Sequence, residues 1–442
     1  MTTTTRDPKT FFVKTYGCQM NELDSQIMSG VLTKRGLSEV KDETLADLLI
    51  FNTCSIRDLA ERKVMGKIGI LSRRKKRNRV IGITGCMANA KKDALLRKLP
   101  HVDFILGTNN IHDLNAVLDM VITTNQRSVL TDDEFTQELD YSAAKRENPF
   151  KAYVSIIRGC NKFCTYCVVP YTRGPEVSRS ASDILTECKT LLDKGCKEIT
   201  LLGQNVNSYG KDFEKEGMLF HELLYQIDKL PYKKWVRFLT SHPVDITMEL
   251  MQAIGSLESL CEHVHFPLQA GSNRILRKMH RIYTKEMYME KVAQLRSIVE
   301  GVALGTDMIV GFPTETEEEF EETLQAMRDV RYAHAFLYTY SQRKGTPAMR
   351  WVDDISDEVK ASRHARIFQL YEEISSSVMQ SMLGQKVEVL VERRNKDSNY
   401  LKAVSRTWHN VIFEGDDSLI GTFQKVTLHS YSHHTFIATL TS

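Results

Sequence analysis

Apolar strand-like runs alternate with helical stretches along most of this 442-residue chain, and this alternation restricts the possible folds more than any other feature. Near the start, helical stretches such as 22–37 and 58–73 separate four such runs. The runs are FFVKTYGC at 11–18, DLLIFNTC at 47–54, RVIGITGC at 79–86 and VDFILG at 102–107. Strands that alternate with helices form parallel sheets. We therefore predict an open parallel α/β sheet domain over residues 9–125.

A second series of the same kind begins at Tyr153, after a polar segment, 125–150, that we interpret as a linker. Its strand-like runs are AYVSIIRGC, KEITLLGQN, KWVRFLTSHP, EHVHFPLQ, GVALGTDMIVGFP and AHAFLYTY. Strands that each precede a helix predict a partial (β/α) barrel over residues 146–378. Residues 380–442 change to short strands separated by Gly, Asp, Asn and Ser, which predicts a small β-barrel.

Three cysteines follow the first strand of the second series, where GCNKFCTYC places Cys160, Cys164 and Cys167 in a CxxxCxxC array. A loop of this length can wrap one four-iron cluster and leave one iron without a protein ligand. S-adenosylmethionine (SAM) can chelate that iron, and an electron delivered through the cluster can then cleave the sulfonium to a 5′-deoxyadenosyl radical. A zinc site is the alternative, but zinc usually takes four ligands and no fourth lies nearby. The array therefore predicts a radical SAM enzyme.

Three further cysteines, Cys18, Cys54 and Cys86, each end an apolar strand, in TYGC, FNTC and ITGC. The carboxyl ends of parallel strands gather at one sheet edge, where ligands bind. We therefore predict that these thiols hold a second cluster, whose open iron could accept an exogenous sulfur species. The alternative is three buried apolar cysteines. We interpret the remaining cysteines as structural, because they share no pattern: Cys188, Cys196 and Cys261.

Bulk properties exclude several classes of protein. The formal net charge is only +3, so any nucleic-acid surface must be a local patch. The start, MTTTTRDPKT, has no apolar stretch, and no run of about 18 apolar residues follows. We expect a cytoplasmic protein without a membrane span. In a reducing compartment its nine cysteines are not expected to form disulfides.

The segments TYGCQMNELDS, FNTCSIR, TGCMA and RGCNKFCTYCVVPYTRGPEVSR resemble the methylthiotransferase family of radical SAM enzymes, over nearly the whole chain. QMN after Cys18 and SIR after Cys54 are similar to the branch that modifies isopentenylated adenosine in tRNA. The branches that act on a ribosomal protein or on threonylcarbamoyladenosine typically carry other residues there. The resemblance implies an N-terminal methylthiotransferase domain, a radical SAM barrel and a C-terminal TRAM domain.

The resemblance also implies the reaction. One SAM methylates sulfur held at an auxiliary 4Fe-4S cluster, and a second SAM, at the cluster of the CxxxCxxC array, gives the radical. The radical removes hydrogen from adenine C2 of N6-isopentenyladenosine at position 37, in the anticodon loop of tRNA, and a methylthio group is installed there. An electron donor such as flavodoxin is implied. The oligomeric state stays open, and a monomer is compatible with the sequence.

Three strand-end segments, LLGQN, TSHP and GTDMIVGFPTE, resemble those that contact SAM. Tyr166, inside the cysteine loop, is a candidate to pack against the adenine ring of SAM. The alternative for each residue is a turn glycine or a helix cap. The other candidates are Gly203, Gln204, Asn205, Ser241, Asp307 and Gly311.

The densest positive run, RRKKRNR at 73–79, and the basic residues around the cysteine loop (Arg158, Lys162 and Arg173) are candidates to contact the tRNA backbone. In the tail, basic residues interleave with aromatic ones, which is a weak RNA signal that the TRAM resemblance strengthens. These residues are Arg393, Arg394, Lys396, Lys402, Arg406 and Lys425, with Tyr400, Trp408 and Phe413. A zinc-stabilised RNA-binding protein without catalysis remains the alternative to an enzyme.

Overall fold

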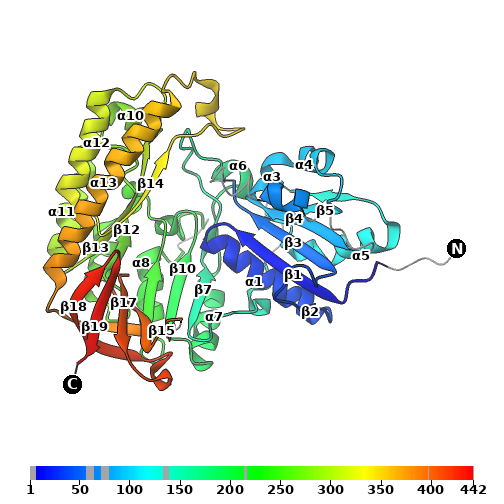
Figure 1. The fold of residues 1–442 in the computed structure, drawn as a ribbon, viewed down its shortest axis with the longest axis horizontal. Helices are drawn as coiled ribbons and strands as arrows, with labels where there is room; N and C mark the ends of the chain where they lie inside the picture. Colours follow the sequence, from blue (N-terminus) through cyan, green and yellow to red (C-terminus); the bar gives the residue numbers. More distant parts are fainter. Residues whose placement is uncertain are drawn as a thin grey trace.

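The computed structural model describes residues 6–55, 64–70, 79–132, 139–213, 217–396 and 398–441. Figure 1 shows three units in chain order: a parallel sheet with its helices, an arc of strands with helices outside it, and a small closed barrel beside that arc. The predicted α/β class with a C-terminal β-barrel is therefore confirmed. None of the helices that the structure describes has the length and apolar character needed to cross a bilayer.

The N-terminal sheet is entirely parallel, with the order β2-β1-β3-β4-β5-β6. Its strands are β1 Thr10–Tyr16, β2 Ser38–Glu39, β3 Leu48–Thr53, β4 Val80–Gly85, β5 Phe104–Leu106 and β6 Ser128–Leu130. Its helices are α1 Gln19–Lys34, α3 Cys86–Lys91, α4 Asp93–Lys98 and α5 Leu114–Thr124, and residues 64–70 are also helical. Leu48 and Ile50 of β3 pack toward α1 and α5, whereas Leu49 and Phe51 pack toward α3 and α4. Burial on both faces explains why β3 and β4 are continuous apolar runs.

Two sequence interpretations in this region need correction. Strand β6 pairs with β5 inside the segment that we interpreted as a linker, because a three-residue edge strand carries too little apolar pattern to be recognised. Arg79, the last residue of the RRKKRNR run, is buried and donates to the carbonyl oxygens of Ala46 and Thr44, so it does not contact a phosphate. The rest of that run, 73–78, lies outside the described residues, as do 58–63 and 71–73 of the predicted second helix.

The central unit has six parallel strands in two sheets, β11-β10-β7 and β12-β13-β14, which the bridge between Val236 and Leu260 connects. Its strands are β7 Lys151–Ser155, β10 Glu198–Leu202, β11 Trp235–Phe238, β12 His263–His265, β13 Ala303–Val310 and β14 His334–Thr339. Its helices are α6 Val169–Arg173, α7 Ala181–Asp193, α8 Phe220–Asp228, α9 Met248–Ser256, α10 Asn273–Lys278, α11 Lys285–Ile298, α12 Glu317–Val330 and α13 Asp357–Met382. Within the described residues β7 and β14 do not pair, so the barrel is partial, as predicted.

Shorter elements complete the chain. Strands β8 Ile157–Arg158 and β9 Val177–Ser178 pair antiparallel on either side of the cysteine loop. The 3-10 turns are η1 Ile111–Asp113, η2 Tyr141–Ala143, η3 Val206–Ser208, η4 Pro243–Asp245, η5 Pro347–Arg350 and η6 Asp417–Leu419.

The C-terminal barrel closes in the order β15-β16-β17-β19-β18. Its strands are β15 Lys386–Arg394, β16 Tyr400–Ser405, β17 Asn410–Glu414, β18 Phe423–Ser432 and β19 Thr435–Leu440. Phe413 is fully buried in its core, Arg406 pairs with Glu262 of the central unit at 2.7 Å, and Trp408 packs against His263. These three residues therefore hold the barrel together or to its neighbour, and their assignment to an RNA-binding surface is wrong.

Candidate active site

The strand register brings Cys18, Cys54 and Cys86 to one edge of the N-terminal sheet. Thr53 of β3 pairs with Tyr16 of β1 on one side and with Gly85 of β4 on the other. The three cysteines follow these paired residues by one or two positions. Adjacent strands lie about 4.8 Å apart, so the three thiols span only two strand spacings. The structure thus places these three residues at the ends of adjacent strands, on the one sheet edge that the sequence predicts.

Local hydrogen bonds fix this edge. Cys18 is the N-cap of α1, and its Sγ lies 3.3 Å from Oδ1 of Asn21. Asn21 donates through Nδ2 to Oδ1 of the buried Asn52 at 2.9 Å. Gly85 has a φ of 92°, and a Cβ there would come within 2.3 Å of the Thr53 carbonyl oxygen. Only glycine therefore lets β4 turn sharply into the helix that begins with Cys86.

A guanidinium from the central unit lies beside these thiols. Burial raises the pKa of Cys18, the charge of Arg173 opposes that rise, and Cys86 adds to it. The pKa of Arg173 is in turn raised, against the effect of its own burial, by Asp24, Cys86 and Cys18. Arg173 ends α6, which contacts α3, and Figure 1 shows these two helices side by side where the two units meet. The first thiol set therefore faces the central unit.

In the second set each thiol accepts an N–H donor. The donors are the Lys162 amide to Cys160 (3.4 Å), Nη1 of the buried Arg281 to Cys164 (3.4 Å) and the Val169 amide to Cys167 (3.5 Å). Burial raises the pKa of Cys160 to about 12 and also raises that of Cys167. A metal centre would offset this cost by stabilising the thiolates. Three thiols with their own N–H donors, two of them on buried residues, fit a 4Fe-4S cluster with one open iron.

No three His, Cys, Asp or Glu side chains gather closely enough to hold a single metal ion, within the part of the chain that the structure describes. Ligands of a four-iron cluster bind different irons and therefore stand farther apart than ligands of one ion. Cys188, Cys196 and Cys261 are at most 3% exposed and lie among the buried side chains of hydrophobic cores, which agrees with a structural role.

Two of the three cations near the cysteine loop, Arg158 and Arg173, do not face solvent as the sequence suggested. Arg158 and Arg173 are each 3% exposed and pair with Asp24 of α1, at 3.3 Å and 3.0 Å. Lys162 pairs with the buried Asp245 at 3.0 Å. The expected contacts of Arg158 and Arg173 to the tRNA backbone are therefore wrong, because a buried carboxylate distant in sequence already binds both charges. The contact of Lys162, whose side chain is 22% exposed, stays a prediction.

Among the SAM candidates, Ser241 is 3% exposed, and its Oγ hydrogen-bonds to none of the described residues. Asp307 Oδ2 accepts from Nε2 of His265 at 3.0 Å, and the Asp307 side chain is 27% exposed. Tyr166 contacts Phe312 edge-to-face, with ring centroids 6.4 Å apart. Ser241 and Asp307 therefore retain polar atoms for a ligand.

Two other candidates support the cysteine loop. Gln204 accepts the Gly159 amide through Oε1 at 2.7 Å, which fixes the start of the loop. Gly203 lies so close to Ile157 that a Cβ would stand 2.4 Å from its Cγ2. Close packing explains Gly203 without a ligand.

Asp245 is a site residue that sequence reasoning missed. It binds Nδ2 of Asn205 at 2.7 Å, Nζ of Lys211 at 2.6 Å and Nζ of Lys162. These donors lower the pKa of Asp245 to about 2, although burial opposes them. Asn205 also accepts the His242 amide at 3.1 Å, so both ends of its side chain are engaged by the protein. No local pattern marks this carboxylate, because its partners come from other loops.

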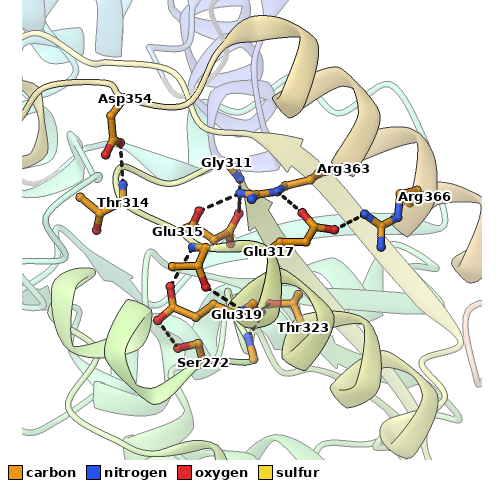
Figure 2. A network of polar contacts seen from close by, with 12 residues as sticks. Ser272, Gly311, Thr314, Glu315, Glu317, Glu319, Thr323, Asp354, Arg363 and Arg366 are labelled. Carbon is orange, nitrogen blue, oxygen red and sulfur yellow. Dashed lines mark hydrogen bonds and ion pairs between the residues drawn. The ribbon is translucent and has the colours of Figure 1, made fainter.

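Figure 2 shows the surroundings of Gly311, at the end of β13. Its amide donates to Oε2 of Glu315 at 2.7 Å, and Arg363 of α13 donates to the same oxygen at 2.9 Å. Arg363 also pairs with Glu317. Burial raises the pKa of Glu315 to about 7. A Cβ on Gly311 would stand 2.5 Å from Cγ of Lys360, so glycine here lets α13 approach the strand end.

Comparisons with known proteins agree with this geometry. The model of "Uncharacterized protein family UPF0004" matches residues 10–107, and that of the "Radical SAM superfamily" matches 154–327. The tRNA-2-methylthio-N(6)-dimethylallyladenosine synthase of Protochlamydia amoebophila is 64% identical over 436 residues, which cover 98% of this chain and 97% of that protein. The protein of the same name from Clostridium botulinum strain Langeland is 44% identical over 95% of this chain and 94% of its own.

Two solved structures share the fold. The radical SAM methyltransferase TsrM of Kitasatospora setae, with cobalamin and a 4Fe-4S cluster bound, aligns with a TM-score of 0.58 and 13% identity. The alignment covers 78% of this chain and 74% of TsrM. The cobalamin-dependent SAM radical enzyme OxsB aligns with a TM-score of 0.51 and 13% identity, over 72% of this chain and 51% of OxsB.

Proposed function

Because the chain belongs to the family of tRNA-2-methylthio-N(6)-dimethylallyladenosine synthases, we propose that it attaches a methylthio group to C2 of N6-isopentenyladenosine at position 37 of tRNA. It is a radical SAM enzyme, and the cofactors of this family are SAM and 4Fe-4S clusters. The observation that carries the proposal is full-length similarity to this family together with two separate sets of three thiols. We further propose that it acts in the cytoplasm on the anticodon loop.

Each thiol set has its own role in the proposal. Cys160, Cys164 and Cys167 hold the cluster at which SAM is cleaved, and the N–H donor to each thiol supports this assignment. Cys18, Cys54 and Cys86 hold the auxiliary cluster, and their position at one sheet edge supports it. When bound, the two clusters together with SAM would supply the radical, the sulfur and the methyl group of the reaction.

Helix α6 connects the two thiol sets. Val169, its first residue, donates to Cys167, whereas Arg173, its last, interacts electrostatically with Cys18 and Cys86. With a rise of 1.5 Å per residue, the Cα atoms of these two helix ends stand only about 6 Å apart along the axis. A single adenine that enters where the two units meet can therefore approach both sets.

The chain's own residues prepare the site in three ways. Burial of Cys160 and Cys164 keeps water away from a reactive radical. Arg281 holds Cys164 through Nη1 and is itself fixed by the hydroxyl of Tyr283 at 2.9 Å. Ser241 offers a free buried hydroxyl at the end of β11, which suits a hydrogen bond to SAM.

The C-terminal barrel offers basic residues for a tRNA surface. In the C-terminal barrel, four basic residues stay at least partly exposed and supply positive charge for the tRNA backbone: Arg393, Lys396, Lys402 and Lys425. A reductant such as flavodoxin would deliver the electron, as the family resemblance implies. A monomer is compatible with the sequence.

The test is a complete reaction. Anaerobically reconstituted protein is incubated with isopentenylated tRNA, SAM and dithionite, and the nucleosides are analysed by mass spectrometry. We expect 2-methylthio-N6-isopentenyladenosine. Unmodified isopentenyladenosine, from protein that carries about eight irons per chain, would contradict the substrate assignment. A colourless protein that binds zinc would instead support the non-catalytic RNA-binding alternative.

A further inference from the structure

The buried carboxylate of Asp24 in α1 is shared by two arginines of the central unit. Oδ1 lies 3.3 Å from Nη1 of Arg158, and Oδ2 lies 3.0 Å from Nη2 of Arg173. The side chains of all three residues are at most 4% exposed. Arg173 therefore shares its carboxylate with a second guanidinium. A buried charge that is incompletely paired is costly, and a further anion beside it would lower that cost.

The remaining terminal nitrogen of Arg173 points to where such an anion would bind. Nη1 is buried and hydrogen-bonds to none of the described residues. Arg173 is the last residue of α6, and α6 contacts α3, the helix that begins with Cys86. The free donor therefore lies where α6 meets the helix that follows the edge of Cys18, Cys54 and Cys86. Buried donors of this kind are seldom left unpaired, because the loss of hydrogen bonds to water costs about 1–3 kcal/mol for each unpaired donor. The cost is larger when the donor is charged.

Both ends of Arg173 are fixed, so the direction of this donor is set by the fold. The carbonyl oxygen of the preceding residue, Thr172, accepts from Oγ1 of Thr108 at 2.9 Å. Arg158 donates through Nη2 to the Thr108 carbonyl oxygen at 3.0 Å. Asp24 holds the far end of the side chain. These contacts cross the junction between the N-terminal and central units, and they keep the guanidinium from turning toward solvent.

We propose that Arg173 is a positioning residue whose free Nη1 donates a hydrogen bond to an anionic sulfur ligand at the auxiliary site, of the hydrosulfide or thiolate class. This inference rests on the proposed role of Cys18, Cys54 and Cys86 as ligands of the auxiliary cluster. A guanidinium donates to an anion about twice as strongly as to a neutral acceptor. Arg173 thereby favours sulfur that arrives as an anion, and it orients that sulfur toward the central unit.

The test uses Arg173→Lys, which keeps the positive charge. An ammonium cannot reach Asp24 and the sulfur ligand at once in the way that the planar guanidinium does. Reconstituted full-length protein is titrated with methanethiolate, and binding is followed by the EPR spectrum of the reduced auxiliary cluster. Loss of one charge-assisted hydrogen bond predicts a dissociation constant about tenfold to a hundredfold higher than that of the wild type.

Arg237→Lys is the matched control. Arg237 is also 3% exposed and pairs with one buried carboxylate, Glu198, at 2.8 Å, but it lies on β11 beside the C-terminal barrel. Its variant is expected to bind methanethiolate like the wild type. Equal affinity of Arg173→Lys and wild type, both carrying about eight irons per chain, would overturn the proposal for Arg173 alone. Wild type with only about four irons would instead overturn the proposed function.

A second measurement does not depend on a variant that folds. Wild-type protein grown with arginine labelled by ¹⁵N in the guanidinium group is examined by pulsed EPR. We expect a ¹⁵N coupling to the auxiliary cluster that strengthens when methanethiolate is added. Arg281 beside Cys164 can also give a coupling, but that one is not expected to respond to methanethiolate. A spectrum without any methanethiolate-dependent coupling would overturn the proposal.

Discussion

Gly85→Ala should remove the auxiliary cluster while leaving the other thiol set intact. Gly85 has a φ of 92° and a ψ of −168°, a conformation open essentially only to glycine. A Cβ there would stand 2.3 Å from the Thr53 carbonyl oxygen, 2.7 Å from the Thr53 amide and 2.5 Å from Oδ1 of Asn52. Because two of these atoms are main chain, β3 and β4 must move apart to accommodate a methyl group.

The expected loss of unfolding free energy has two parts, the backbone strain of a positive φ and the steric clash of the added Cβ. Gly36 has a φ of 96° but no atom within 4 Å of an added Cβ, so Gly36→Ala introduces a positive φ without a clash. That variant should lose about 1–2 kcal/mol of unfolding free energy. Gly85→Ala adds the clash with β3, and we expect a loss of at least about 3 kcal/mol. Asn52 would also shift, and through Asn21 it supports Cys18.

The assay combines urea unfolding with iron analysis and SAM cleavage. For Gly85→Ala we expect about four irons per chain and SAM cleavage that persists, but no methylthiolated product. For Gly36→Ala we expect about eight irons and normal product. Equal destabilisation of the two variants, or a full iron load in Gly85→Ala, would refute the reasoning that this glycine shapes the auxiliary site.

Three further predictions can be checked separately. Cys164→Ala should abolish SAM cleavage, whereas Cys54→Ala should keep cleavage and lose sulfur insertion; methylthiolation by the Cys54 variant, seen by nucleoside mass spectrometry, would contradict the assignment. Arg281→Met should lower the reduction potential of the SAM-cleaving cluster in an EPR redox titration, because a cation beside Cys164 favours the more negative reduced state; an unchanged potential would contradict this role. Burial lowers the pKa of His334 to about 4 and of His409 to about 3, below the unfolded value of about 6.5. The unfolding free energy that these two neutral histidines contribute is therefore fully present above about pH 6.5 and is lost as the pH falls. For both together the loss is about 2 kcal/mol between about pH 6 and pH 5. His409→Gln should make the urea midpoint depend less steeply on pH.

Much of the fold could be predicted because its signals are local. Buried parallel strands are continuous apolar runs that end in Gly or Thr before a cysteine, so the N-terminal sheet and the shared edge of Cys18, Cys54 and Cys86 could be inferred. The CxxxCxxC array lies within eight residues and needs no tertiary information. The role of the cysteines as ligands remains a prediction, as do the domain boundaries.

The errors arose where a charge has a partner distant in sequence. Arg158 and Arg173 look like solvent-facing cations beside a loop, but their carboxylate, Asp24, lies 134 and 149 residues earlier in the chain. Arg406 likewise pairs with Glu262, 144 residues away. A basic residue that contacts a phosphate and a basic residue that forms an ion pair between two structural units look the same in a sequence. Charge alone therefore does not distinguish the two roles. Phe413 was wrongly assigned to an RNA-binding surface for a related reason. The alternation of apolar and polar residues along a strand does not show which face of the strand is buried in the barrel.

Iron and sulfide analysis of three matched proteins tests the central claim, that two separate sets of three thiols each hold a four-iron cluster. Wild type should contain about eight irons per chain, and alanine replacement of either set should leave about four. Of the two triple variants, only the one that lacks Cys18, Cys54 and Cys86 should still cleave SAM, as the wild type does. A wild type with about four irons, or a triple variant that keeps all of its iron, would contradict the account.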